Sequence, residues 1–514
     1  MSNFTDGLNS EQARAVTHAD GPLLILAGAG SGKTKTLTHR IAYLIGELKI
    51  FPSRILAVTF TNKAAKEMRQ RLAQILGEDS ENRQFMPWMG TFHSICVRML
   101  RMDGENIGLN KRFLIYDTDD QISLIKQIMK ARGLTDKDIK PRAVLSVISN
   151  AKNEMRNAED FSASTRGPRE QKIAELFFAY EKALKDASAL DFDDLLIKTV
   201  ELLRNKPDIR HKWQQQFEHI LIDEYQDTNA VQYALIKLLV NSRRNLCVVG
   251  DDAQSIYSFR GADYTNILNF ERDFPGTTVV KLEQNYRSTG AILNMANALI
   301  SHNIHRTDKN LWTANGDGVE PKLWQLYNES EEALAIANEI QAQIANGRQY
   351  GDVAVLYRTN AQSYAIERAL RQSYIPYKIV GGLRFLDRAV VKDLLAYLRL
   401  LYQPSDRVSF LRIVNTPKRG VGAVSISKFL DWNDASERDI ISGLLAVEEA
   451  DTLTARAKRP LLEFGQKLHD LQQEIDGSPA ELIEKIMKST GYEDFINDGT
   501  PQAEERMENI GVLL

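Results

Sequence analysis

A glycine-rich segment directly after a short apolar run is the feature that most constrains how this chain can fold. The run from Leu23 to Leu26 has the length of a buried strand, and a helix-like pattern begins soon after it. Between them lie Ala27, Gly28, Ala29, Gly30, Ser31, Gly32, Lys33 and Thr34. Glycines let successive backbone N–H groups face one anion, and the next helix adds its positive N-terminal end. The order of strand, loop and helix therefore predicts a phosphate-binding loop.

The last two residues of this loop supply the chemistry of a nucleotide site. Lys33 would reach the β and γ phosphates, and the Thr34 hydroxyl would ligate Mg²⁺. The usual pattern begins with glycine, where this chain has Ala27. An ordinary glycine-rich turn would explain the glycines but not the sequence Gly-Lys-Thr. We therefore expect a nucleoside triphosphate and Mg²⁺ to bind here.

Composition narrows the class of protein. The chain has 514 residues, more than one hydrophobic core usually serves, so we expect several domains. Hydrophobic content is 43%, and no apolar run approaches the roughly 18 residues of a membrane span. The two cysteines, Cys96 and Cys247, lie alone in apolar segments, which favours reduced core residues of a cytoplasmic protein. The net charge of −3 gives no sign of nucleic-acid binding, which must therefore depend on local residues.

Apolar runs of strand length recur along the chain, with helical patterns between most of them. They are Leu23–Leu26, Ile55–Phe60, Ile220–Asp223, Leu246–Gly250 and Thr278–Leu282. This alternation predicts a parallel, doubly wound α/β core of the P-loop NTPase type.

The strand pattern disappears between residues 105 and 190, where Asp119–Arg132 and Arg169–Lys185 are helix-like. We expect an inserted helical subdomain there. A second α/β segment is predicted to begin near Gly276, with a buried strand at Val353–Tyr357. A long helical region with few strands is predicted from Gly381 to the last residue.

A second nucleotide motif lies at the end of the strand near residue 220. Two carboxylates, Asp223 and Glu224, follow the apolar run directly, at the sheet edge where α/β folds bind ligands. Asp223 can hold Mg²⁺ through its water shell, and Glu224 is the candidate general base for the attacking water. A solvated acidic strand end is the alternative. Two later residues, Gln254 and Arg287, also follow strand-like runs, and they could sense the γ-phosphate and neutralise developing charge.

Taken together, these motifs closely resemble the UvrD/PcrA/Rep family of superfamily 1A DNA helicases. The resemblance runs in order along nearly the whole chain. The matching segments are Leu8–Gln12 (the Q motif), Thr59–Ala65 (motif Ia), Gly90–Ser94 (motif Ib), Leu190–Leu195 (the return from the helical insertion), Asp223–Thr228 (motif II) and Val249–Ala262 (motif III).

The resemblance implies roles for residues of the ATP site. It implies that Gln12 reads the adenine edge and that Tyr286 stacks on the adenine ring. Gln254 would be the γ-phosphate sensor, and Arg287 would be an arginine finger from the second motor domain. Arg71 would supply a further phosphate contact.

The resemblance also implies a DNA track, and a physical argument supports it. Every base has a π-face, so aromatic side chains hold single strands with about 1–3 kcal/mol per base whatever the sequence. The implied contacts to single-stranded DNA are Phe60, Asn62, His93, Tyr257, Phe259 and Arg260, and those to duplex DNA are Arg384, Lys418 and Arg419. Asn360 is a further implied DNA contact. For the two phenylalanines, a place in the core is the alternative.

The chain departs from the family pattern at several positions. Phe259 stands where tryptophan is usual, Tyr364 replaces a usual arginine, and Val390 replaces a usual glutamate. Motifs V and VI are missing after Leu514, and the last apolar residues continue a helical face without a cap. We therefore expect a truncated chain that binds ATP and DNA but hydrolyses and unwinds poorly.

The resemblance also implies a division into domains. Residues 1–104 and 190–278 would form the first RecA-like motor domain, and residues 105–189 its helical insertion. Residues 279–380 would be the first part of the second motor domain, and residues 381–514 an incomplete helical subdomain.

The function implied is that of an ATP-dependent 3′-to-5′ DNA helicase in DNA repair or replication. Its partners would be single-stranded DNA, junctions of single- and double-stranded DNA, and accessory proteins of repair or replication, with no membrane. Two alternatives stay open. A P-loop ATPase that does not act on nucleic acid would show no stimulation by DNA. A DNA-binding scaffold would bind DNA whether or not a nucleotide is present.

Overall fold

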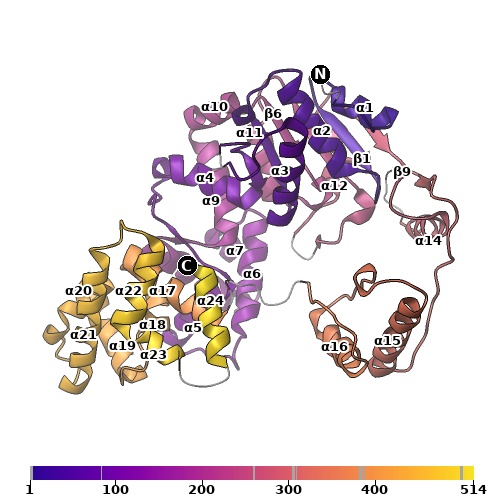
Figure 1. The fold of residues 1–514 in the computed structure, drawn as a ribbon. Helices are drawn as coiled ribbons and strands as arrows, with labels where there is room; N and C mark the ends of the chain where they lie inside the picture. Colours follow the sequence, from indigo (N-terminus) through magenta and orange to yellow (C-terminus); the bar gives the residue numbers. More distant parts are fainter. Residues whose placement is uncertain are drawn as a thin grey trace. The chain divides into compact units, whose positions relative to one another are not determined.

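The computed structural model describes residues 4–82, 84–258, 261–303, 307, 309–380, 386, 388–497 and 502–514. They form two compact units (Figure 1). The first comprises residues 1–318 and 393–514, and the second comprises residues 319–392. Each is described by itself.

A six-stranded parallel sheet is the centre of the first unit. Its strand order is β3-β2-β6-β7-β1-β8. The strands are β1 (Leu23–Ala27), β2 (Ile55–Thr59), β3 (Met89–Thr91), β6 (His219–Ile222), β7 (Leu246–Gly250) and β8 (Thr278–Leu282). All five strands predicted in the core are present, and the α/β prediction is confirmed. The sheet is a P-loop NTPase sheet with its phosphate loop after β1.

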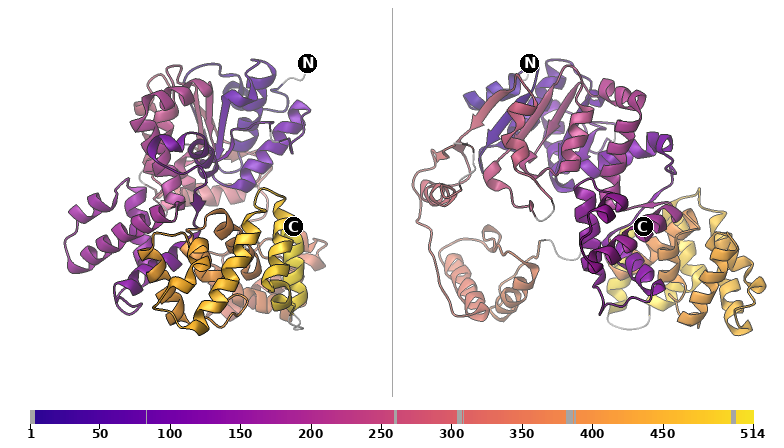
Figure 2. Two further views of the ribbon diagram at one scale, coloured as in Figure 1. Left: turned by 90° about the vertical axis from the view of Figure 1, so that its left-hand side faces the viewer. Right: turned by 180° about the vertical axis from the view of Figure 1, so that it is seen from behind.

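Helices cover both faces of the sheet (Figure 2, left). Side chains alternate between these two faces, and each face packs on its own helices. Leu24, Leu56 and Ile220 pack on one face, and Ile25, Ala57 and Leu221 pack on the other. The first face is covered by α4 (Phe92–Asp103), α9 (Phe192–Asn205) and α11 (Ala230–Leu239), and the second by α2 (Lys33–Gly46) and α3 (Asn62–Leu76). Burial on both faces explains why the strands read as continuous apolar runs.

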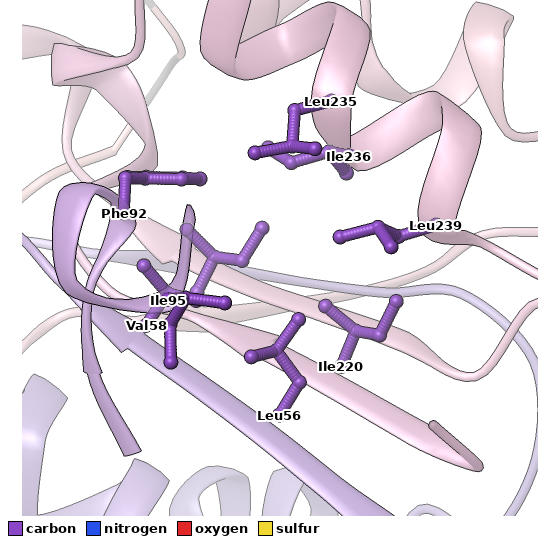
Figure 3. Close-up of a pocket in the computed structure, with 9 residues that line it drawn as sticks. Leu56, Val58, Phe92, Ile95, Ile220, Leu235, Ile236 and Leu239 are labelled. Carbon is purple, nitrogen blue, oxygen red and sulfur yellow. The ribbon is translucent and has the colours of Figure 1, made fainter. Parts of the chain in front are cut away.

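The core between the sheet and the helices α4, α9 and α11 is tightly packed, with a very small cavity. A cavity of about 10 Å³ lies between β2, β6, α4 and α11, and only apolar side chains line it, among them Val58, Phe92 and Leu239 (Figure 3). The two cysteines lie on opposite faces, and both are buried and free, as predicted. Burial raises the pKa of the Cys96 thiol to about 12.

The helical insertion is also as predicted. It consists of α5 (Thr118–Ala131), α6 (Pro141–Asn153), α7 (Ala158–Ala163) and α8 (Pro168–Asp186), which share a separate apolar cluster. Two short parallel strands, β4 (Leu114–Ile115) and β5 (Ala189–Leu190), close the insertion where the chain leaves and re-enters the sheet domain. Further α-helices of this domain are α1 (Ser10–Thr17), α10 (Pro207–Gln216), α12 (Thr265–Leu268) and α13 (Phe270–Asp273).

The C-terminal part of the chain is helical, as predicted. After α17 (Ala389–Tyr402), the first unit includes α18 (Arg407–Ile413), α19 (Ala423–Ala435), α20 (Ile440–Leu445), α21 (Ala455–Gln472), α22 (Pro479–Thr490), α23 (Tyr492–Ile496) and α24 (Gln502–Leu513). These helices dock on the insertion (Figure 1). Tyr116 donates a hydrogen bond to Asp406 over 2.6 Å, and Arg399 pairs with Asp120 at 2.6 Å. In the part of the chain that the structure describes, no helix combines the length and apolar character needed to cross a membrane.

The segment near Gly276 completes the first sheet before it continues into other elements. β8 pairs with β1 from Thr278 to Leu282. It is followed by β9 (Gln284–Asn285), α14 (Gly290–Ile300) and β10 (Trp312–Thr313), all within the first unit. The predicted boundary between residues 278 and 279 therefore falls inside β8. The division into domains stays a prediction.

The second unit contains α15 (Glu329–Ala345) and α16 (Ser363–Gln372), which bury a small cluster that includes Ala337 and Leu370. The predicted buried strand at Val353–Tyr357 is wrong. Val353 and Val355 do pack on the cluster, and burial alternates along the segment. A strand also needs a hydrogen-bonded neighbour, and the described residues of this unit provide none.

Candidate nucleotide-binding and DNA-binding site

The phosphate loop lies between β1 and α2 and depends on two glycines with left-handed backbone angles. Gly30 has φ of +67° and Gly32 has φ of +85°, which favour glycine over residues with a side chain. A Cβ atom on Gly30 would also lie only 2.8 Å from Cβ of Arg287. The loop is therefore shaped both by its own backbone and by the close approach of a distant segment.

That distant segment, residues 284–288, is held on the loop by hydrogen bonds. The Asn285 amide donates to the carbonyl of Ala29 over 2.5 Å, and the backbone N–H of Tyr286 donates to the carbonyl of Gly30 over 3.0 Å. The Asn285 side-chain oxygen in turn accepts from the backbone N–H of Arg287 at 2.8 Å. The exposed Arg287 side chain thus starts beside the phosphate loop, as an arginine that meets the nucleotide would require. Sequence reasoning missed Asn285, although it lies next to the two residues singled out there.

Lys33 meets the strand end that carries the acidic pair. Its ammonium group forms an ion pair with Glu224 at 3.1 Å, and the Gln226 amide donates to the same carboxylate oxygen over 2.9 Å. Glu224 has φ of +49°, so its side chain leaves a tight turn directly after β6. The side chain of Lys33 is 11% exposed and that of Glu224 is 35% exposed. The phosphate loop and the acidic strand end therefore face each other, as the sequence predicts.

Buried carboxylates crowd this strand end. Burial, and next the charge of Glu224, raise the pKa of Asp223 to about 7, with Lys33 opposing the change. The same two causes raise the pKa of Asp227 to about 6. One buried oxygen of Asp227 has no hydrogen-bond partner. A cation beside these groups would relieve their repulsion, so the site suits a divalent metal electrostatically.

The donor set fits Mg²⁺ in particular. Asp223 lies at the end of β6, and Thr34 is half-buried in the first turn of α2. The described residues contain no group of three or more His, Cys, Asp or Glu side chains arranged to hold a metal. Mg²⁺ at phosphate sites usually has one or two carboxylate ligands and takes the others from water and phosphate.

Gln254 lies in a loop that is tied to the acidic strand end. Its side-chain amide donates to Asp251 over 2.5 Å, and the backbone N–H of Asp251 donates to Gln226 over 2.9 Å. Since Gln226 also contacts Glu224, one short chain of contacts joins the predicted base to the predicted γ-phosphate sensor. Sequence reasoning missed this role of Gln226.

Lys309 is a second residue that sequence reasoning missed. Its side chain is 8% exposed and forms ion pairs with Asp251 and, at 2.6 Å, with Asp252. Thr307 adds a backbone N–H donated to Asp252 over 2.8 Å. Lys309 is separated from both aspartates by more than 50 residues, so no local pattern could have revealed the pairs.

The residues predicted to meet adenine lie beside the phosphate loop. Gln12 is buried, donates to the carbonyl of Ser31 over 2.9 Å and accepts from the backbone N–H of Asn9 at 3.1 Å. Asn9 also donates to the hydroxyl of Tyr286 over 2.9 Å, and the Tyr286 side chain is about half exposed. The amide of Gln12 is thus engaged with protein atoms on both sides. Its contact with adenine stays a prediction.

Arg71 is not brought to the phosphate loop by any contact among the described residues. It is exposed on α3, and its ion pair is with Glu67, one turn away on the same helix, at 3.8 Å. Its phosphate contact stays a prediction.

Aromatic side chains gather at the same edge of the sheet. The rings of Phe60, after β2, and Tyr257, after β7, lie 5.0 Å apart and are inclined by 31°. His93, near the start of α4, meets Phe192, the first residue of α9, edge to face at 6.0 Å. Phe192 is 45% exposed, so its ring offers a surface for stacking. Sequence reasoning missed Phe192, although it stands inside the segment Leu190–Leu195.

The other predicted DNA contacts differ in their surroundings. Phe259, Arg260 and Arg384 lie outside the described residues. Three other predicted contacts have exposed side chains. They are Asn62 at the start of α3, Asn360 in the second unit, and Lys418 before α19.

Arg419 is held inside the C-terminal helical region. Its guanidinium donates to the carbonyl of Ile413 over 2.6 Å and to the hydroxyl of Tyr397 over 2.7 Å. It also lies 4.0 Å from the ring centre of Phe464. This engagement favours a structural role for Arg419 over the predicted contact to duplex DNA.

Comparison with known proteins covers both parts of the site. Residues 8–275 match the UvrD/REP helicase N-terminal domain, and residues 280–493 match the UvrD-like helicase C-terminal domain. The ATP-dependent DNA helicase PcrA of Bacillus subtilis is 46% identical over 518 residues, which cover 100% of this chain and 69% of that protein. PcrA of Leuconostoc citreum is 44% identical with the same coverage. PcrA of Staphylococcus epidermidis is 43% identical over 99% of this chain and 70% of that protein.

Proposed function

This chain belongs to the UvrD/REP helicase family, and we propose that it moves 3′ to 5′ along single-stranded DNA and opens duplexes at junctions. It is a DNA helicase and a DNA-dependent ATPase by that membership. The direction of movement rests on the family resemblance alone. The observation that carries the proposal is the seating of residues 284–288 on the phosphate loop, which brings Arg287 beside Gly30.

ATP is the substrate that fits the nucleotide site. The backbone N–H groups of the loop and the start of α2 would hold the phosphates. Lys33 would leave its ion pair with Glu224 and bind the β and γ phosphates instead. Asp223 and Thr34 would hold Mg²⁺, which supplies charge neutralisation at the β and γ oxygens. Tyr286, beside the loop, would carry the base, and Gln12 would read its edge.

The Lys33–Glu224 ion pair suggests how hydrolysis depends on a bound triphosphate. While Lys33 pairs with Glu224 at 3.1 Å, one oxygen of the carboxylate is occupied by the ammonium group. A γ-phosphate would draw Lys33 away and leave Glu224 free to accept a proton from the attacking water. The water oxygen then forms a bond to phosphorus as the bond to the leaving ADP breaks. Arg287 would neutralise charge on the γ-phosphoryl oxygens, and Gln254 would hydrogen-bond to one of them.

The aromatic edge would hold the DNA strand. Phe60 and Tyr257 form one ring pair, and His93 and Phe192 form another. Bases can stack on such rings without regard to sequence, as a translocating motor requires. Tyr257 follows the loop that contains Gln254, so a change at the γ-phosphate could reach the track over a few residues. Movement would then follow from two DNA affinities that alternate with the nucleotide state.

The remaining predictions concern cellular context and extent of activity. Accessory proteins of DNA repair or replication as partners, and a cytoplasmic location, remain predictions. Weak hydrolysis and weak unwinding also remain a prediction. Turnover by this chain at the rate of a PcrA helicase, measured side by side, would contradict that prediction.

One experiment tests the proposed function against its alternatives. ATP turnover is measured with and without a short oligo(dT) strand, and unwinding is compared on duplexes with a 3′ or a 5′ single-stranded tail. We expect stimulation by the oligonucleotide and preference for the 3′ tail. An ATP turnover rate that is the same with and without the oligonucleotide would favour a P-loop ATPase that does not act on nucleic acid. An affinity for the oligonucleotide that is the same with and without ATP would favour a DNA-binding scaffold.

A further inference from the structure

Three segments that are far apart in the sequence converge on one side chain, Asn153, at the end of α6. Asn229 follows motif II and is the N-cap of α11, Gly261 lies near the end of motif III, and Asp193 lies in the first turn of α9. All of them belong to the first unit. The segment that contains Asp193 was singled out in the sequence, but the proposed function gives Asp193 itself no role.

The contacts around Asn153 use both ends of its amide. Its oxygen accepts a hydrogen bond from the Asn229 side chain at 2.7 Å, and its nitrogen donates to Asp193 over 3.1 Å. Ser149, one turn earlier on α6, donates to the other oxygen of Asp193 over 2.7 Å. A Cβ atom on Gly261 would lie 3.5 Å from Cβ of Asn153, so the backbone of Gly261 packs directly on this residue.

One side of this cluster is firmly anchored. Lys152, next to Asn153, is buried and pairs with Asp191 at 2.7 Å and with Asp194 at 2.6 Å. Tyr180 of α8 donates to Asp191 over 3.0 Å. These contacts hold α6 against the start of α9, because separating them would leave buried charges unpaired. Asn153 is therefore attached to a firmly anchored part of the site.

The other side connects to the nucleotide site. Glu224 and Asn229 are separated by the 3₁₀ turn Tyr225–Asp227. The residue before Asn229, Thr228, accepts the backbone N–H of Asp263 at 3.0 Å, and Asn229 forms an isolated antiparallel bridge with Ala262. A movement of Glu224 would thus change the position of Asn229 and of the end of motif III together.

We propose that Asn153 is a positioning residue that couples the nucleotide site to the DNA track through its hydrogen bonds to Asn229 and Asp193. Asp193 directly follows Phe192, whose ring meets His93. The amide of Asn153 transmits the position of the motif II loop to the helix that begins with that ring. The coupling rests on the proposed function, since it needs both ATP and single-stranded DNA as ligands.

The test measures coupling separately from binding. The affinity of the full chain for a fluorescent oligo(dT) strand is determined with and without a non-hydrolysable ATP analogue, and ATP turnover is determined with and without the oligonucleotide. For Asn153→Asp, which opposes a carboxylate to Asp193, we expect the ratio of the two affinities and the stimulation of turnover to fall at least about fivefold, within the usual range of coupling between sites. Basal turnover should change less than about twofold.

A rescue variant separates this role from a general effect on structure. The double variant Asn153→Asp with Asp193→Asn restores a donor opposite an acceptor between these two positions with the direction reversed. Both variants lose the hydrogen bond that the Asn153 amide donates to the carbonyl of Ser149 over 2.8 Å, so coupling in the double variant should be at least about twofold higher than in Asn153→Asp alone. Failure of the double variant to raise the coupling would overturn the proposal. Unchanged coupling in Asn153→Asp alone would also overturn it.

A second variant covers the case in which Asn153→Asp does not fold. Asn229→Ser keeps a good N-cap for α11 but removes the amide that reaches Asn153. It should lose coupling as Asn153→Asp does, with an unchanged thermal midpoint. The matched control is Asn157→Ser, which alters another asparagine N-cap, that of α7, and should change nothing. Equal behaviour of the two cap variants would overturn the proposal.

The unmodified chain distinguishes this inference from the function on which it rests. If it shows neither DNA stimulation nor an effect of nucleotide on DNA affinity, the proposed function fails and the coupling fails with it. If it shows both and Asn229→Ser retains both, only the coupling role of Asn153 is refuted.

Discussion

Replacing Asp223 by asparagine should stabilise the sheet domain while it removes the proposed ligand for Mg²⁺. The carboxyl group is buried at the end of β6, and burial together with the charge of Glu224 raises its pKa from 3.8 to about 7. At pH values between 3.8 and about 7, Asp223 keeps its proton in the folded chain but releases it in the unfolded chain. The free energy of unfolding therefore falls as the pH rises from about 4 to about 7, and no further loss from this group follows above about pH 7.

The size of the effect follows from the same two values. Each tenfold difference in proton affinity corresponds to about 1.4 kcal/mol, so the full change is about 4 kcal/mol above pH 7 and about 2 kcal/mol at pH 5.5. Asparagine keeps the shape and the oxygen that accepts the backbone N–H of Glu224, but it carries no charge. We therefore expect Asp223→Asn to be more stabilising at pH 8 than at pH 5.5 by about 2 kcal/mol.

Urea unfolding at the two pH values measures this difference. Tryptophan fluorescence reports on the sheet domain because Trp88 and Trp213 pack together at 5.0 Å in its core. Asp476→Asn, at an exposed position between α21 and α22, serves as the control for the substitution itself. A stabilisation by Asp223→Asn that is equal at pH 5.5 and pH 8 would refute the electrostatic reasoning. Added Mg²⁺ and ATP should raise the stability of the unmodified chain more than that of the variant.

Three further predictions follow from contacts in the site. Lys33→Ala should weaken ATP binding at least about tenfold, as expected for loss of a charge-assisted hydrogen bond, and should leave salt-sensitive DNA binding in place. If the variant and the unmodified chain bind a fluorescent nucleotide equally well, residues 27–34 are not the phosphate-binding loop. Tyr257→Ala should weaken oligonucleotide binding by about 1–3 kcal/mol, whereas Tyr257→Phe should not, as fluorescence anisotropy can show. Lys309→Met should lower the free energy of unfolding by about 3–5 kcal/mol, because Asp251 loses its buried partner. Lys63→Met, which breaks an ion pair on the surface, should lower it by less than about 1 kcal/mol. Similar losses for the two variants in urea unfolding would show that burial of the ion pair does not matter.

Local sequence patterns predicted most of the architecture correctly. The strands of the core, the helical insertion and the helical C-terminal part all follow from apolar periodicity and its interruptions. The phosphate loop and the acidic strand end were placed correctly for the same reason, since each motif directly follows a strand. The pattern failed at Val353–Tyr357, where alternating burial reflects packing on helices and not pairing in a sheet.

Long-range contacts are the part that local patterns could not provide. Lys309 has nothing in its neighbourhood that points to Asp251, and Asn285 shows no sign that its amide holds the phosphate loop. Arg419 follows proline and lysine and precedes glycine, which is typical of an exposed turn. Its guanidinium is nevertheless engaged by Tyr397 and Phe464, which the chain supplies from two other helices.

The sequence by itself determined the secondary structure, the parallel sheet and the two motifs of the nucleotide site. These features depend on residues that are neighbours in the chain, where spacing and side-chain type set the backbone and the local chemistry. Only the tertiary structure decided which charges pair and which side chains meet across segments. It brought Lys33 to Glu224, and Asn153 between Asn229 and Asp193. Such contacts are settled by the packing of whole elements, because burial lets a polar group remain only where a distant partner satisfies it.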